Sequence, residues 1–441
     1  MELKNKDIRG GSVGNLDVLI GLFYGDEGKG KIVQYLADSY DLVCRFNGGP
    51  NAGHTIYINS ESVVLNTISC GIFSGPSLCA DGMVVNPVLL KEEIEKVIKY
   101  GADVKNNLFI GTGVHIILPT HLLMDKAEEM AKGDNKIGST QMGICPVYRD
   151  KAGREGVRVG DILQPNFKDI YDRQVAKHCK ILMELYNYDA TVELATMTEQ
   201  FFSAIEYIKQ YKNNFVNSSA FVNDYLQKGK KVLAEGAQAT MLDISFGTYP
   251  FVTSSRTLAS AASSELGIGA QYTKNVYGVL KAYTTRVGGG PLATRVGAEL
   301  EAYLQEVAHE RGARTGRPRN VAWLDLPTLR YAIALNGATS MVLTKLDIFD
   351  LMKEDLKICT HYMVNGVEKN TIDFNLVTEN DNVVPVYTDF KNWQGQKSEG
   401  IKKYEELPEQ ARVYLEFIET QVGIPLSIIS VGAGKDDLIL K

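Results

Sequence analysis

The sequence has no apolar stretch of about 18 residues, so we expect no helix that spans a membrane. Its first fifteen residues, MELKNKDIRGGSVGN, are polar and lack the apolar centre of a secretory signal. We therefore interpret residues 1–15 as a flexible N-terminal tail and expect a cytoplasmic protein.

Cysteines and basic residues are too scattered to support several classes of function. The six cysteines form no C-x-x-C pair and have no regular spacing, which argues against a disulfide framework and against a thiolate metal site. The formal net charge is −6, and the chain has no run of Lys and Arg of the kind that binds nucleic acid. We expect small-molecule ligands, no nucleic acid and no membrane partner.

The sequence does contain short apolar runs that alternate with longer helical patterns, which is typical of an α/β fold. With 44% hydrophobic residues among 441, the chain can bury a full core. We predict a large, mainly parallel central sheet with helices on both faces and small antiparallel or helical insertions. Helices are expected at 31–40 and 87–101. The predicted central strands are 16–23, 42–47, 230–238, 275–283, 340–347 and 426–434.

Several of these strands end in Gly, Asp, Gln, Lys or Thr. In open α/β sheets the ligand lies outside the carboxyl ends of the strands, so we expect one extended site built from distant segments. Separately, Asn365-Gly366 lies between two strand-like arms in ICTHYMVNGVEKN, which predicts a hairpin appended to the main sheet.

The loop 25–31, GDEGKGK, satisfies the P-loop pattern G-x-x-x-x-G-K but places Ile32 where the magnesium-binding hydroxyl should follow. Its glycines and the helix after it favour an anion, whereas Asp26 and Glu27 repel one. A carboxylate ~4 Å from a phosphate oxygen costs roughly 4 kcal/mol at an effective dielectric of 20. This is explained if a cation lies between them or if the acid takes a proton from the substrate. The simpler interpretation is a helix N-terminus whose acids favour the dipole.

Two further segments fit a P-loop-like GTP site. TKLD, residues 344–347, puts Asp347 at a strand end, where it can accept hydrogen bonds from the ring N–H and the amine of guanine, with the Lys345 stem along the base. GARTGRPR, residues 312–319, carries three arginines that can grip carboxylates or phosphates. The alternatives are a surface turn and a solvated basic loop.

Together these segments resemble the adenylosuccinate synthetase family. The resemblance rests on YGDEGKGK, RFNGGPNAGHT, EGAQATMLDISFGTYPFVTSS, KAYTTRVGGGP, WLDLPTLR and LTKLD, and it runs from about residue 16 to residue 441. It implies a single family-like domain over 16–441 with insertions. It also implies a cytoplasmic homodimer that uses GTP and Mg²⁺ to join IMP to L-aspartate, yielding adenylosuccinate, GDP and phosphate.

The resemblance also implies roles for three catalytic residues. Asp26 takes the N1 proton of IMP and ligates magnesium, so that O6 attacks the γ-phosphoryl group of GTP and gives 6-phosphoryl-IMP. His54 acts as the general acid, and Lys29 stabilises the transferring phosphoryl group. The aspartate amine then displaces phosphate from C6.

Binding residues follow from the same motifs. The residues implied for GTP are Gly28, Lys29, Gly30, Gly53, His54, Thr55, Arg319, Lys345, Asp347, Ser430 and Gly432. Those implied for IMP are Asp26, Asn51, Thr140, Arg154, Gln238, Thr253 and Val287, with Arg154 reaching the site of the neighbouring subunit. Those implied for L-aspartate are Thr315, Arg317 and Arg319. Those implied for the metal are Asp26 and the backbone of Gly53.

The chain departs from the family pattern at positions near the expected ligands: Gln141, Met142, Arg256, Arg295, Arg314 and Pro318. These changes leave open a paralogue that ligates aspartate to another 6-oxopurine nucleotide such as dGMP. A GTP-binding switch without synthetic chemistry is a further alternative. Against a switch, Ile32 offers no magnesium ligand and Asp26 has no purpose there.

Overall fold

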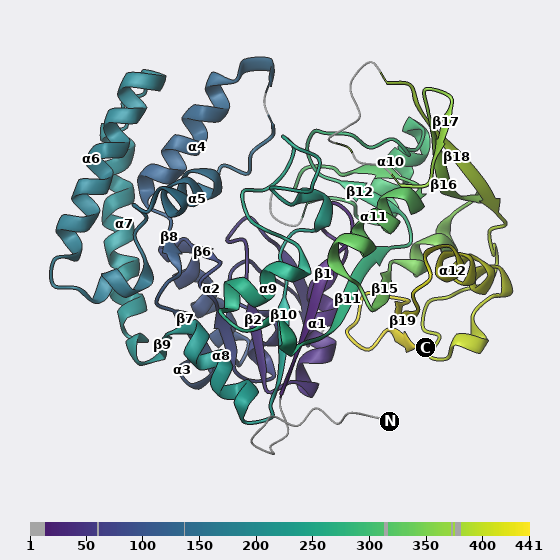
Figure 1. Ribbon diagram of the computed structural model, residues 1–441, viewed down its shortest axis with the longest axis horizontal. Coiled ribbons are helices and arrows are strands. Elements are labelled where there is room, and N and C mark those ends of the chain that lie inside the picture. Colours follow the sequence, from purple (N-terminus) through teal and green to yellow (C-terminus); the bar gives the residue numbers. More distant parts are fainter. Residues whose placement is uncertain (1–13, 60, 136, 313–315, 372–373, 375–380) are drawn as a thin grey trace.

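The computed structural model describes the chain except residues 1–13, 60, 136, 313–315, 372–373 and 375–380 (Figure 1). Within the described residues, the largest sheet has ten strands, all parallel to their neighbours except β20, which is antiparallel to β19. Their order across the sheet is β20 (Leu438–Leu440), β19 (Leu426–Ser430), β15 (Ser340–Thr344), β11 (Thr273–Lys281), β1 (Asn15–Gly21), β10 (Lys231–Glu235), β2 (Leu42–Arg45), β5 (Ser77–Cys79), β7 (Leu108–Gly111) and β9 (Phe215–Val216). The six predicted central strands are all members of it.

Both faces of this sheet are covered, as predicted. Along β1, Leu16, Val18 and Ile20 enter one hydrophobic core, while Leu19 enters the other. Successive side chains of a strand point to opposite faces, so a near-continuous apolar run belongs in a sheet buried on both sides. The packing partners are helices α8 (Ser218–Gln227), α9 (Ala259–Leu266), α11 (Leu326–Asn336) and α12 (Glu409–Val422) on the first core, and α1 (Lys29–Leu36), α2 (Pro87–Lys99) and α7 (Thr191–Lys209) on the second.

The predicted helices are present with shifted bounds. The helix expected at 31–40 begins earlier, at Lys29, and ends at Leu36 before a 3-10 turn, Ala37–Ser39. The helix expected at 87–101 is α2, capped by the Asn86 side chain and with Pro87 at its first turn. Where the structure is described, no helix combines the length and the hydrophobicity that crossing a membrane requires.

A helical insertion lies at one end of the molecule. In Figure 1, α4 (Pro119–Ala131), α6 (Phe167–Tyr186) and α7 stand together, and α4 contacts both of the others. They enclose a small apolar core of their own around Leu123 and Leu182. The remaining helices are α3 (Val104–Asn107), α5 (Ile144–Gly153) and α10 (Ala298–Val307).

The predicted hairpin exists, but its place was predicted wrongly. The turn at Asn365-Gly366 has φ of 51° and 80°, as a tight hairpin turn requires. However, β16 (Leu356–Val364) pairs with β14 (Leu324–Asp325), β17 (Val367–Lys369) and β18 (Val383–Phe390), which together form a separate sheet. Because these partners occupy its edges, β16 cannot join the main sheet. The other small pairs are β3 (His54–Ile58) with β4 (Glu61–Leu65), β6 (Val84–Val85) with β8 (His115–Ile116), and β12 (Thr284–Arg286) with β13 (Asn320–Ala322).

The predicted tail at 1–15 falls almost wholly outside the described residues. Gly14 already donates its N–H to the Leu226 carbonyl (2.8 Å), and Asn15 begins β1. In the main sheet, β1, β10, β2, β11 and β15 end at one edge: Glu235 pairs with both Leu19 and Arg45, and Lys281 pairs with Thr344. The loops at this edge hold the candidate site.

Candidate active site

The glycine loop follows β1 and leads into α1. Gly25 and Gly28 have φ of 92° and 87°, and Asp26 between them has φ of 60°. These left-handed conformations turn the chain sharply before the helix. A side chain on Gly30 would lie 3.0 Å from both the His54 Cβ and the Thr55 carbonyl oxygen. The loop therefore packs directly on β3, which brings Lys29, His54 and Thr55 together.

The two acids of this loop point to different partners. Glu27 is buried; its Oε2 accepts from the Lys29 Nζ (2.7 Å) and its Oε1 from the Gly25 N–H (2.8 Å). Glu27 thus pairs with the Lys29 ammonium group and stabilises the loop from inside. Asp26 instead keeps its side chain 25% exposed and pairs with Arg319. Of the two acids, only Asp26 remains open to a ligand.

Asp26 meets the arginine loop directly. Its Oδ2 accepts from Nε (2.9 Å) and Nη2 (2.7 Å) of Arg319. The Nη1 of Arg319 bonds instead to the buried carboxylate of Glu310. Burial lowers the pKa of the Arg319 guanidinium, but the two carboxylates more than offset this, and the pKa is raised overall. Segments 293 residues apart in the chain thus meet at one point.

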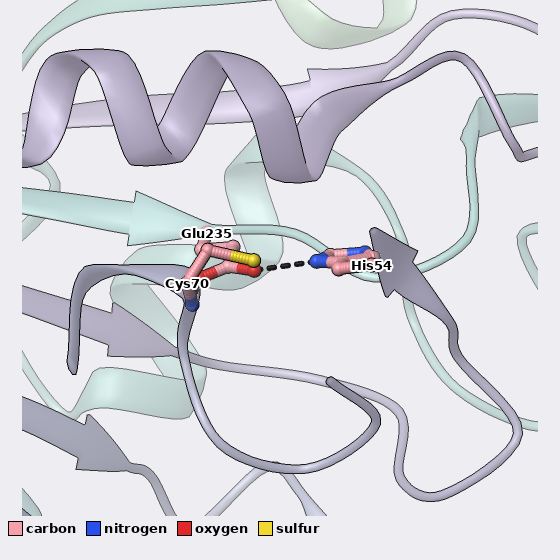
Figure 2. A group of neighbouring side chains, drawn as sticks. All are labelled: His54, Cys70 and Glu235. Atoms are coloured by element: carbon pink, nitrogen blue, oxygen red, sulfur yellow. Dashed lines mark hydrogen bonds and ion pairs between the residues drawn. The ribbon is translucent and has the colours of Figure 1, made fainter. Parts of the chain in front are cut away.

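His54 is buried and held by an acid at the end of β10. Its Nδ1 lies 2.5 Å from the Glu235 Oε1 (Figure 2). Glu235 also accepts from the Ser69 hydroxyl (2.7 Å) and the Cys70 N–H (3.1 Å), which fixes the carboxylate. With Nδ1 committed to Glu235, the other ring nitrogen, Nε2, is left to face a ligand.

Burial and charge act in opposite directions on this pair. Burial lowers the pKa of His54, and the positive charges of Arg45 and Lys29 add to this, whereas Glu235 opposes it. Burial alone would raise the pKa of Glu235, but the hydrogen bond and charge of His54 lower it to about 2. Glu235 is therefore a carboxylate that stabilises a proton on the imidazole.

His54, Cys70 and Glu235 also have the composition of a metal site, with ligand atoms within 4.8 Å of one another. Two features argue against that role. The Nδ1 of His54 and the Oε1 of Glu235 bond to each other. Burial raises the pKa of the Cys70 thiol well above its ordinary value, which disfavours the thiolate that a metal needs. The cluster is better described as support for His54.

Three residues implied for IMP lie side by side. The Gln238 Nε2 donates to the Asn51 Oδ1 (3.1 Å), and the Asn51 Nδ2 lies 3.5 Å from the Thr253 Oγ1. The Gln238 Oε1 is buried and has no hydrogen-bond partner among the described residues. An unpaired amide oxygen in a polar row is suited to accept from a ligand.

A second group gathers around Gly138. Its carbonyl accepts from the Arg317 Nη2 (3.1 Å), and a side chain on Gly138 would lie 3.9 Å from the Gly288 Cα. Thr140 is two residues from Gly138, and Val287 precedes Gly288. The structure thus places the loop of Thr140 beside Val287 and Arg317.

The segments implied for guanine converge as well. The Lys31 Nζ donates to the Ser430 Oγ (2.7 Å) and to the Gly432 carbonyl (2.8 Å). Thr344, which begins TKLD, donates its hydroxyl to the Glu27 carbonyl (2.7 Å), which ties this strand end to the glycine loop. Burial lowers the pKa of Lys31 to about 8.

Asp347 and Lys345 complete this end of the site. Asp347 lies just after the end of β15, in the 3-10 segment Leu346–Leu351, and burial raises the pKa of its carboxyl group. Lys345 has φ of 63° and donates its Nζ to the Ala308 carbonyl (3.1 Å).

Among the described residues, Arg154 is a predicted site residue that is not brought into this group. Arg154 is exposed at the end of α5. Thr315 lies outside the described residues. Arg154 nevertheless shares a feature with Asp26, Gln238 and Lys345, because all four have positive φ, between 57° and 64°. Such conformations are costly for residues other than glycine and concentrate at functional sites.

Three of the positions that depart from the family pattern, Met142, Arg295 and Pro318, have structural partners. Met142 packs on the apolar cluster around Ile144, and Arg295 forms a two-bond ion pair with Glu301 (2.7 and 3.0 Å). Pro318 forms an isolated antiparallel β-bridge with Arg311 at the base of the arginine loop. Gln141 and Arg256 are exposed, and Arg314 lies outside the described residues.

Sequence reasoning missed Glu235, Glu310 and Lys31. Each had a sequence cue: Glu235 ends an apolar strand, Glu310 precedes the arginine loop, and Lys31 is the second lysine of the glycine loop. Nothing in the sequence, however, indicates which atoms they meet.

The sheet, the glycine loop and the strand-end acid define an α/β nucleotide-binding enzyme. A sequence model of the family described as adenylosuccinate synthetase matches residues 18–439. The chain therefore belongs to the adenylosuccinate synthetase family. Members of this family are ligases that form a C–N bond, with GTP as co-substrate and Mg²⁺ as cofactor.

Similar proteins agree with this assignment. Adenylosuccinate synthetase from Parabacteroides distasonis is 44% identical over 97% of this chain and 99% of its own length. That from Flavobacterium psychrophilum is 44% identical over 97% and 100%. The fully ligated Plasmodium falciparum enzyme superposes with a TM-score of 0.87 at 34% identity, covering 98% of this chain and all of the other.

A more distant structure shares the fold alone. The cyanophage S-2L succinoaminodeoxyadenylate synthetase, solved with dGMP and dATP, has a TM-score of 0.61 at 17% identity over 97% of this chain and 95% of its own. Because the relatives at 44% identity are named for adenylosuccinate synthesis, neither the dGMP-dependent paralogue nor the GTP switch is favoured.

Proposed function

We propose that this chain joins IMP to L-aspartate at the expense of GTP, and that the residues assembled at the sheet edge carry out the reaction. The observation that carries the proposal is Asp26, a partly exposed carboxylate in a glycine loop, in contact with Arg319 of the arginine loop. The carboxylate of Asp26, which can act as a base, and the guanidinium of Arg319, which can bind an anion, are thus adjacent to a helix N-terminus suited to phosphate.

The donor set suits magnesium. The Asp26 carboxylate and the Gly53 carbonyl are hard oxygen ligands, and neither residue is fully buried. Bound there, Mg²⁺ would supply charge that offsets the repulsion between Asp26 and the phosphates of GTP. Gly28, Lys29, Gly30 and Thr55 form the loop and strand that would hold these phosphates.

In the proposed mechanism Asp26 accepts the proton from N1 of IMP, so that O6 attacks the γ-phosphorus of GTP, the bond to the β-phosphate oxygen breaks and GDP leaves. Lys29 compensates charge on the phosphoryl group as it moves. His54, stabilised by Glu235, donates at Nε2 to the phosphate oxygens. The aspartate amine then attacks C6 and phosphate leaves.

Recognition is assigned to three sets of residues, one for each substrate. Asn51, Gln238 and Thr253, with Thr140 and Val287, would contact IMP. Lys345, Asp347, Ser430 and Gly432 would contact guanine, since an acid that accepts from its ring N–H and amine is left unpaired by adenine. Thr315, Arg317 and Arg319 would bind the carboxylates of aspartate.

The direct test is synthesis by purified protein with GTP, Mg²⁺, IMP and L-aspartate. We expect the absorbance rise of a 6-substituted aminopurine, together with one GDP per product. With dGMP in place of IMP, we expect at most about a tenth of the rate, a difference of about 1.4 kcal/mol in the barrier. The proposal would be contradicted by GTP hydrolysis whose rate does not depend on IMP and L-aspartate. It would also be contradicted by a faster reaction with dGMP than with IMP.

We further propose a homodimer in which Arg154 binds the IMP phosphate in the neighbouring subunit. The exposed side chain and left-handed backbone of Arg154, outside the gathered site of its own chain, support this. We also infer a single functional unit over 16–441, supported by the family match over 18–439, and a cytoplasmic location.

The shared site predicts complementation between inactive variants. Asp26→Asn and Arg154→Ala subunits should each be inactive alone. After equal mixing and subunit exchange, half of the dimers are mixed and each has one intact site, so about a quarter of wild-type activity should return. Activity is measured before and after exchange, with wild type mixed with Asp26→Asn as the control. No recovery despite proven exchange would place Arg154 in its own subunit's site, and an active Arg154→Ala variant would place it outside catalysis.

A further inference from the structure

Glu310 accepts hydrogen bonds from Arg319 through both its backbone carbonyl and its side-chain carboxylate. The Arg319 N–H donates to the Glu310 carbonyl (2.9 Å), while Nη1 bonds to the Glu310 carboxylate. Glu310 is fully buried, so this bond is shielded from water and salt. The arginine that closes the loop is thus tied to one fixed acid.

Glu310 is itself held by two groups from the end of β11. The Lys281 Nζ donates to both carboxylate oxygens (3.0 and 2.9 Å), and the Tyr283 hydroxyl donates to Oε1 (2.5 Å). Lys281 is anchored in turn by the Thr285 hydroxyl (2.7 Å). The carboxylate therefore has little freedom to move.

The charges of this group explain why Glu310 stays ionised. Burial alone would raise the pKa of Glu310, but the positive charges of Lys281, Arg319 and Lys345 lower it to about 2. Burial lowers the pKa of Lys281 to about 8, with Glu310 opposing the shift. A buried acid that remains charged at neutral pH is a permanent anchor for a cation.

The guanidinium of Arg319 consequently has two different sides. Nη1 is committed to Glu310, and the edge formed by Nε and Nη2 faces the single oxygen Oδ2 of Asp26. That edge is the fork that matches a carboxylate or phosphate in two parallel bonds. If Asp26 turned to ligands of its own, this edge would become available, while the bond to Glu310 would keep the guanidinium in place.

We propose that Glu310, supported by Lys281 and Tyr283, is the positioning residue that orients Arg319 toward the anionic groups of L-aspartate and GTP. This rests on the ligand role proposed for Arg319. Glu310 is fully buried and its carboxylate bonds to Lys281, Tyr283 and Arg319, so its effect on a substrate would pass through Arg319. A misplaced binding group of this kind costs on the order of 100-fold in rate.

The test measures steady-state kinetics for each substrate in Glu310→Gln. We expect kcat/KM for L-aspartate and for GTP to fall by roughly 10- to 100-fold, with KM for IMP within about threefold of wild type. Tyr283→Phe is the matched control, since it removes one bond to the same carboxylate but leaves Arg319 bound, and it should lose less than about threefold. Circular dichroism and thermal melting verify the fold of each variant.

A second variant separates positioning from charge neutralisation. Glu310→Gln alone leaves the buried Lys281 without its carboxylate partner, and adding Lys281→Met removes that unpaired charge. If Glu310 only neutralised Lys281, the double variant would regain wild-type kinetics. If Glu310 positions Arg319, kcat/KM for L-aspartate and GTP should stay low. In an Arg319→Ala background, Glu310→Gln should add less than about twofold. Wild-type kinetics in Glu310→Gln, or recovery of kcat/KM when Lys281→Met is combined with it, would overturn the inference. Inactive wild-type protein would instead refute the proposed function.

Discussion

Asp26→Asn should abolish adenylosuccinate synthesis, with kcat lowered by at least about 1000-fold, or about 4 kcal/mol. Asparagine has nearly the same shape but cannot accept the N1 proton, and it replaces a charged magnesium ligand with a neutral one. Product formation is followed by absorbance with all substrates saturating. If activity stays within about tenfold of wild type, a residue other than Asp26 is the base.

The fold of Asp26→Asn should be intact, because its side chain is partly exposed and makes one ion pair. Asp38→Asn is a suitable control, since Asp38 is exposed in the 3-10 turn after α1 and lies outside the candidate site. Binding of GTP without magnesium should be retained by both variants, which distinguishes loss of the base from collapse of the glycine loop. A variant that binds no GTP would point to a structural role.

The α/β architecture could be predicted because its strands and their ends follow local rules. The apolar run of β1 belongs to a strand buried on both faces, and the glycines after it mark the turn into α1. The hairpin at Asn365-Gly366 was equally local and is present. Its assignment to the main sheet was wrong, because strand pairing depends on which edges are free, and no local pattern records that.

The candidate site also combines residues that local motifs predict with residues that only the fold brings together. Asp26, His54 and Asp347 occupy motifs, and the strand-end rule correctly predicted that distant segments meet. The carboxylates of Glu235 and Glu310 are fully buried, and their importance comes from a histidine 181 residues away and an arginine nine residues away. A buried acid indicates a partner, but only the fold identifies it. The supporting residues could not be predicted for this reason.

His54→Ala should lower kcat on the order of 10²- to 10⁴-fold, with KM for IMP changed by less than about threefold. The Cβ of His54 lies close to Gly30 of the glycine loop, and Glu235 commits Nδ1, so Nε2 is the atom that can donate to the moving phosphoryl group. Steady-state rates with saturating GTP and L-aspartate measure the effect. Glu235→Gln should reproduce part of the loss, because an amide stabilises a protonated imidazole less than a carboxylate does.

His361→Ala controls for the loss of a histidine as such. His361 is on β16, in the separate sheet, and its Nδ1 bonds to the Thr360 hydroxyl, so its removal should leave kcat unchanged. Because the pKa of His54 is lowered by burial and Glu235 opposes that shift, losing the carboxylate lowers it further. The Glu235→Gln defect should therefore grow as pH rises, since less of His54 is protonated. A pH-independent defect, or full activity of His54→Ala, would remove the proton-donor role from His54 and leave it a packing residue beside the loop.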